Sequence, residues 1–134
     1  MDKELVVVSG KVIEQQRSYT TKVGKDIGYE TGAKMVKRHF DQHPDEATAA
    51  FMGREIIEGI LSQPGCIGIR VFNGVDELGI RKPIFVGVDK NGNNILHLDT
   101  RRNAIVAGGA KICPPYCGVN EDLEATEEES GSWW

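Results

Sequence analysis

The segment from Gly53 to Phe72, GREIIEGILSQPGCIGIRVF, constrains the fold most, because it joins an amphipathic helix, a stop and a strand. Apolar residues recur four positions apart in two adjacent rows, which are Met52, Ile56 and Ile60, and Gly53, Ile57 and Leu61. The helix therefore has one broad apolar face that needs a sheet or a second helix to cover it. Pro64-Gly65 ends the helix, since proline lacks an amide hydrogen and glycine accepts a positive φ. The β-branched and aromatic residues that follow predict a central strand over 66–72.

Further elements can be placed on both sides of this segment. A strand is predicted over Leu5 to Ile13, with a bulge or turn at Gly10, and the polar stretch 14–28 reads as a loop. Three more strands are predicted, over 84–88, 95–98 and 104–107. Within the turn at 89–94, Asn91-Gly92 favours the positive φ angles of type I′.

A second helix is expected from Thr31, which is a suitable N-cap, and Pro44 follows its end. Its apolar stripe consists of Tyr29, Ala33, Val36 and Phe40. One strand before two helices and several strands after them, joined by short turns, predict an α+β fold. We expect a single domain over 1–117, with an antiparallel sheet of four or five strands and both helices packed on one face.

The end of the chain differs in composition from the rest. Six acidic residues fall within the last fourteen: Glu121, Asp122, Glu124, Glu127, Glu128 and Glu129. The formal net charge is −4 for the whole chain and +2 once these six are removed. Residues 118–134 therefore form an acidic tail ending in Trp-Trp, too polar to build a core of its own. A body with so small a positive charge lacks the concentrated basic face of a nucleic-acid binder, so no nucleic-acid partner is expected.

The N-terminus has mixed charge and an apolar run of only four residues, Leu5 to Val8, too short for a signal-peptide core or a membrane span. Three cysteines, an odd number, fit a reducing compartment better than a secreted disulfide framework. A cytoplasmic location without a membrane span is therefore expected.

The cysteines leave three readings open. Cys113 and Cys117 have three residues between them, including two prolines that stiffen the loop. A closed zinc site needs four ligands, so Cys66 and a histidine such as His97 would have to join them. The other readings are a disulfide between Cys113 and Cys117, or reduced cysteines that pack in the interior.

Two other groups of polar residues are candidates for a binding or catalytic site. His39 and His43 lie four apart on one helix face, as metal-binding pairs do, but no glutamate follows His39 in the zincin pattern. We interpret them as a surface pair at a helix end, where positive charge is favoured. Arg54, Glu55 and Arg70 could form a polar site or ordinary ion pairs.

The motifs GREIIEGILSQPGCIGIR, FVGVDKNGNNIL and CPPYC together resemble a family of small uncharacterised bacterial proteins. The resemblance covers about residues 30 to 118 and implies one domain, with no established activity and no catalytic residues to carry over.

Taken together, these features predict a non-enzymatic structural or interaction protein without a cofactor, which assembles with itself into an oligomer or filament through its termini. Its interaction residues are expected in the tail region, at Tyr116, Leu123, Trp133 and Trp134, because large aromatic side chains are the usual anchors of an interface. The alternative is a thiol- or zinc-dependent protein using Cys66, Cys113 and Cys117. An enzyme with a pocket at Arg54, Glu55 and Arg70 is a third hypothesis.

Overall fold

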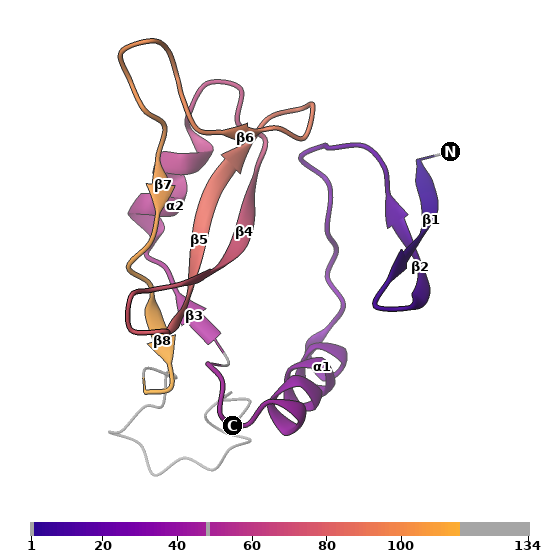
Figure 1. The fold of residues 1–134 in the computed structure, drawn as a ribbon. Helices are drawn as coiled ribbons and strands as arrows, with labels where there is room; N and C mark the ends of the chain where they lie inside the picture. Colours follow the sequence, from indigo (N-terminus) through magenta and orange to yellow (C-terminus); the bar gives the residue numbers. More distant parts are fainter. Residues whose placement is uncertain (1, 48, 116–134) are drawn as a thin grey trace.

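The computed structural model of the chain describes residues 2–47 and 49–115, which contain two helices and three antiparallel sheets (Figure 1). The strands are β1 (Lys3–Val8), β2 (Lys11–Gln16), β3 (Ala49–Phe51), β4 (Gly68–Val75), β5 (Arg81–Val88), β6 (Asn94–Ile95), β7 (Val106–Ala107) and β8 (Lys111–Cys113). The helices are α1 (Tyr29–Gln42) and α2 (Arg54–Leu61). This arrangement confirms the predicted α+β class. Neither helix in the described ranges combines the length and apolar character needed to cross a bilayer.

The largest sheet is built around β5. Strand β4 pairs with β5 along its whole length, with Gly68 opposite Val88 and Val75 opposite Arg81. The short strands β6 and β7 share the other side of β5. Within the described residues β4 is therefore an edge strand with β5 as its single partner, so the predicted central position of this strand is wrong.

Helix α2 covers one face of this sheet, as its apolar pattern predicts. Ile60 is fully buried, and Ile56 and Ile57 are half-buried. The helix contacts both β4 and β5. The buried apolar side chains of the described residues are Ile60, Val86, Val88, Ile95, Ala107 and Cys113. The core thus lies between α2 and the end of β5 that carries Val86 and Val88.

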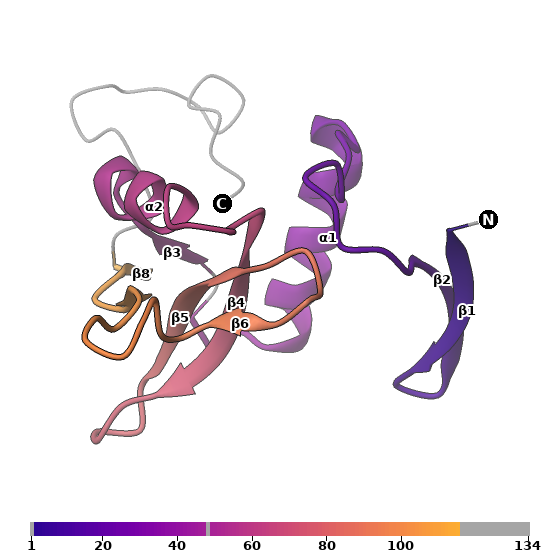
Figure 2. The ribbon, with the colours of Figure 1, turned by 90° about the horizontal axis from the view of Figure 1, so that it is seen from above.

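Helix α1 does not share that position, so the expectation that both helices pack on one face is wrong. It lies beside the sheet in both views (Figures 1 and 2) and has no buried residue. It begins at Tyr29 after Gly28, whose φ is +83°, and not at Thr31. Three residues of the predicted apolar stripe are nevertheless half-buried, namely Ala33, Val36 and Phe40.

The N-terminal segment, predicted as one strand over Leu5 to Ile13 with a bulge or turn at Gly10, forms a hairpin of two strands. Strands β1 and β2 pair in register, and Ser9 and Gly10 between them have φ of +51° and +76°. Positive φ at both central residues is the type I′ pattern. The hairpin stands apart from the main sheet (Figure 1) and contacts the other described elements only marginally.

The turn after β5 is a hairpin, but its predicted type is wrong. Gly92 has φ of +82°, whereas Asn91 has an ordinary negative φ. The Gly92 N–H donates to the Asp89 carbonyl at 3.0 Å, and two further N–H groups donate to the Asp89 side chain. This is a type I turn followed by a bulge glycine, which needs positive φ at one residue only.

The ribbon of β3 and β8 was not predicted from the sequence. Ala49 lies opposite Cys113 and Phe51 opposite Lys111, so the ribbon joins segments about sixty residues apart. Both strands have three residues, too few for an alternating pattern to be recognised.

Candidate functional site

The Gln63-to-Cys66 motif, which ends α2, serves the packing of the core. The buried Gln63 side chain donates from Nε2 to the Ile60 carbonyl at 3.0 Å. Its Oε1 accepts the Ile105 N–H at 2.7 Å. Both ends of the amide are therefore satisfied, and the end of α2 is tied to the segment that leads into β7.

Cys66 continues the same contact. A Cβ built on Gly87 of β5 would lie 2.9 Å from the Cys66 Sγ and 3.2 Å from the Gln63 Nε2. The Cys66 thiol donates to the Gly68 carbonyl at 3.2 Å. Glycine at position 87 thus lets the end of α2 approach the sheet.

The zinc reading of the cysteines lacks support from the geometry. Cys113 is disulfide-bonded, so it offers no thiolate for a metal. Its partner lies outside the described residues, as does Cys117. Cys66 is a free, half-buried thiol. His97 is exposed in a bridge to Asn103. Within residues 2–47 and 49–115, neither Cys66 nor His97 joins a group of three possible metal ligands.

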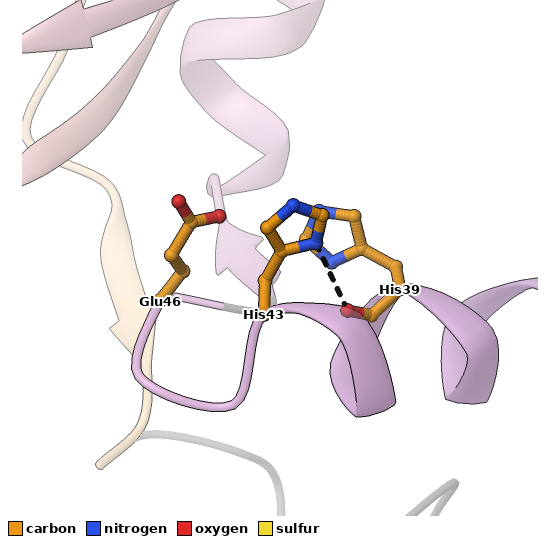
Figure 3. Close-up of side chains that lie close together, drawn as sticks. All are labelled: His39, His43 and Glu46. Atoms are coloured by element: carbon orange, nitrogen blue, oxygen red, sulfur yellow. Dashed lines mark hydrogen bonds between the residues drawn. The ribbon is translucent and has the colours of Figure 1, made fainter.

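A different group of ligands does come together at the end of α1. Donor atoms of His39, His43 and Glu46 all lie within 4.8 Å of one another. The two imidazole rings stack with centroids 4.6 Å apart, and all three side chains point to the same side of the chain (Figure 3). Sequence reasoning recognised the histidine pair, confirmed here as exposed at a helix end, but missed Glu46. That glutamate follows the helix, so helical spacing gave no signal for it.

Arg81 of β5 is the other partner of Glu46. Its Nη1 lies 3.0 Å from the Glu46 Oε2. This ion pair fastens the segment after α1 to the main sheet. It also leaves the second carboxylate oxygen, Oε1, for another partner.

The hypothesis of a polar pocket at Arg54, Glu55 and Arg70 is not supported, because the arginines have separate partners. Arg54 faces Glu58 along α2 at 3.8 Å. Arg70 donates to the Gly92 carbonyl at 3.2 Å and to the Asn94 Oδ1 at 2.6 Å.

The ring of Tyr19 lies over the guanidinium of Arg70, with 5.7 Å from Cζ to the ring centroid. A Cβ on Gly92 would touch three atoms of the same ring. Tyr19 belongs to the linker that follows the hairpin. Its ring holds this linker against the β5–β6 turn through the cation–π contact with Arg70, and Gly92 leaves room for the ring.

A cavity of about 300 Å³ lies between β4 and β5 on one side and the β3–β8 ribbon on the other. Its apolar lining includes Val71, Pro83, Phe85 and Ile112. Two cations stand at its edge, but Glu46 holds Arg81, and Asp76 holds Lys82 at 2.7 Å. The volume is at the lower end of ligand-binding pockets, and the basic groups already have acidic partners.

Among the described residues, Asp2, Asp76 and Asp99 have lowered pKa values. The Lys82 ammonium lowers the pKa of Asp76 most, helped by the N–H of Ile80. For Asp99 the main cause of the lowered pKa is the N–H of Arg101, and for Asp2 it is the Ser18 hydroxyl. In each case hydrogen bonds favour the charged carboxylate. Asp76 and Asp99 fix turns, whereas Asp2 joins the start of β1 to Ser18 in the linker after β2.

The expected interaction residues Tyr116, Leu123, Trp133 and Trp134 lie outside the described residues. A scan against family models and searches of curated proteins and of solved structures gave no match.

Proposed function

We propose that this chain is a non-enzymatic structural module that associates with copies of itself, using the β1–β2 hairpin as one of its contacts. The observation that carries the proposal is the apolar surface of that hairpin. Leu5, Val7 and Val12 are 72%, 71% and 68% exposed, although they lie in paired strands. A hairpin that leaves its valines in water gains almost nothing from the hydrophobic effect.

The hairpin is also short of support. A two-stranded hairpin is only marginally stable in water and normally needs a third strand or a helix against it. Here the hairpin contacts the rest of the described chain mainly through its own linker, which Tyr19 attaches to the body. Docking on another surface would supply the missing burial.

The surface that we assign to it is the open edge of β4 in a second copy. Within the described part of the chain, β4 pairs on one side only, with β5. It carries the exposed apolar residues Val71, Phe72 and Val75. An edge strand with free backbone groups and apolar side chains is the surface to which a strand from another chain adds.

A second copy is the favoured source because a chain's own hairpin is kept away from its own β4. The linker 17–28 lies between them in both views (Figures 1 and 2). Each copy would therefore offer one hairpin and one open edge. Such head-to-tail contacts give a ring if the rotation closes and a filament if it does not.

Sedimentation of the full chain over a range of concentrations tests the proposal. Val7→Asp should weaken association by about 30-fold, because burying one valine contributes about 2 kcal/mol. Gln15→Asp is the matched control, since it adds the same charge at an exposed position of the same hairpin, and it should change association little. A wild-type chain that stays monomeric, or equal association of both variants, would contradict the proposal.

The cytoplasmic location expected from the sequence stays a prediction. The disulfide at Cys113 is typical of proteins outside reducing compartments. Trapping free thiols in freshly lysed cells separates the two cases. Three reactive cysteines per chain would support the cytoplasm, and one reactive cysteine would contradict it.

A further inference from the structure

We propose that His39, His43 and Glu46 form a three-ligand site for a late first-row divalent transition-metal ion such as Zn²⁺ or Cu²⁺. This inference is independent of self-association. It rests on three donors of suitable chemistry meeting at one place (Figure 3). Two imidazoles and one carboxylate are ligands that these ions accept, whereas Mg²⁺ and Ca²⁺ prefer oxygen alone.

The backbone prepares the first two ligands. His39 is in the last turn of α1 and His43 is its C-cap residue, so their four-residue spacing places both rings on one side. The His43 Nδ1 lies 3.3 Å from the His39 carbonyl oxygen. Because a carbonyl oxygen can only accept, this contact places the proton on Nδ1 and leaves the Nε2 lone pair for a metal. Histidine ligands are commonly oriented by such a bond from the other ring nitrogen.

The third ligand, Glu46, is also held in place by a neighbouring group. Arg81 contacts the Oε2 of Glu46 at 3.0 Å, which limits the rotation of the carboxylate and leaves Oε1 available. The Glu46 side chain is only 34% exposed, so less of its freedom is lost when an ion binds. The carboxylate also contributes the negative charge that a pair of neutral imidazoles lacks.

The remaining adjustment is small. Ligands of a tetrahedral ion with bonds of about 2.1 Å lie roughly 3.4 Å apart. The present separations reach at most 4.8 Å, so closing the site needs a movement of about 1 Å. Both histidines are exposed and can turn about their side-chain bonds without disturbing a core. Three protein ligands leave a fourth position open to water or to a ligand from another molecule.

Calorimetric titration of the untagged full chain with ZnCl₂, repeated with CuCl₂, tests the site. One equivalent should bind. His39→Ala, His43→Ala and Glu46→Gln should each lower affinity by about tenfold or more, a loss that even outer-shell partners of metal ligands can cause. His97→Ala is the matched control, because it removes an exposed histidine away from the group and should leave binding unchanged.

A direct readout separates loss of a ligand from loss of structure. Since α1 has no buried residue, the two histidine variants should keep the circular dichroism of the wild type. In ¹H–¹⁵N spectra of the imidazoles, one equivalent of Zn²⁺ should shift a ring-nitrogen signal of His39 and the Nε2 signal of His43, and leave the signals of His97 in place. Absence of stoichiometric binding, equal binding by either histidine variant, or full affinity in Glu46→Gln would overturn the three-ligand site.

Discussion

Because Gly92 has no side chain, the linker after the hairpin can pack against the β5–β6 turn. The ring of Tyr19 occupies the place that a Cβ would take. Gly79 is its counterpart in the turn between β4 and β5, with the same φ of +82° but nothing within 4 Å of a Cβ. Both glycines donate to the carbonyl of an aspartate three residues earlier, at 3.0 Å. The two positions therefore differ mainly in the presence of Tyr19.

Substituting each glycine by alanine should separate backbone strain from the Tyr19 contact. Both Gly92→Ala and Gly79→Ala should destabilise their turns by about 1–2 kcal/mol, because alanine disfavours a positive φ. Only Gly92→Ala should also displace the Tyr19 ring and free the linker. Trypsin should then cut after Lys22 and Lys25 several-fold faster in Gly92→Ala than in Gly79→Ala. Equal cleavage rates would show that Tyr19 does not hold the linker.

The Asp76 carboxylate is a second place where one group fixes a turn. Its Oδ1 accepts the N–H groups of Leu78 and Ile80, both at 2.9 Å, and its Oδ2 faces Lys82. These bonds favour the charged form, so the pKa in the folded state is below the ordinary value of 3.8. The stabilisation is therefore fully present above pH 3.8 and is lost as the pH falls through the folded pKa.

An NMR titration of the side-chain carboxyl carbons should place the midpoint of Asp76 below 3.8. Lys82→Met should raise that midpoint, because the ammonium is the largest cause of the lowered pKa. In Asp76→Asn the stability of the turn should no longer fall through this pH range. An Asp76 midpoint at or above 3.8 would contradict the assignment.

At the scale of elements, Gln63 connects α2 to the strand segment before β7. Its amide bonds the nearby Ile60 carbonyl and also the Ile105 N–H, which lies 42 residues further along the sequence than Gln63. The neighbouring contact of Gly59 with Ile105, 3.3 Å from a built Cβ to Cδ1, places the two segments in direct packing. A polar side chain in this core is therefore a structural link between elements.

Gln63→Met should test this link, because methionine keeps the approximate shape but removes both hydrogen bonds. The Ile105 N–H would lose its partner in a partly buried site, at a cost of about 1–3 kcal/mol. Gln42→Met, at an exposed position, should change stability by about 0.5 kcal/mol or less. Urea unfolding measures both. An equally small effect at Gln63 would show that the amide does not support the core.

For the whole molecule, the described part has a small core and a large amount of peripheral apolar surface. Its buried apolar residues are confined to α2, the main sheet and β8, whereas α1 and the hairpin bury none. Small cores give little net stability, and association of the folded state with a partner adds to it. The hairpin leaves apolar side chains exposed to water, and the proposed self-association would bury them.

Replacing Trp133 and Trp134 with serine should reduce assembly if the tail contributes a second contact, because two indoles are removed from any interface they fill. Sedimentation of this variant and of a variant that also carries Val7→Asp compares the two termini. If the contacts are separate, their effects on the association free energy should add. Unchanged association after the tryptophan replacement would remove the tail from the proposal while leaving the hairpin.

Features decided by near neighbours could be read from the sequence. The inward face of α2 follows from its four-residue spacing, and its end follows from Pro64-Gly65. The β-branched runs predict strands over 66–72 and 84–88, and these form most of β4 and β5, although both strands extend further toward the turn between them. Helical periodicity and turn chemistry are local properties and indicate where helices and turns lie, although the type of the turn after β5 was not predicted correctly.

Features that join distant segments were decided only in the folded chain. No local pattern predicts that β3 pairs with β8, that α1 lies beside the sheet, or that Glu46 joins the histidine pair with Arg81 behind it. Each of these contacts depends on the entropic cost of closing the loop between two distant segments and on which apolar surfaces are buried together. A local sequence pattern carries no information on either. The two helices and the longer strands could therefore be predicted approximately, while the short strands β3 and β8 and the arrangement that creates the candidate metal site and exposes the hairpin could not.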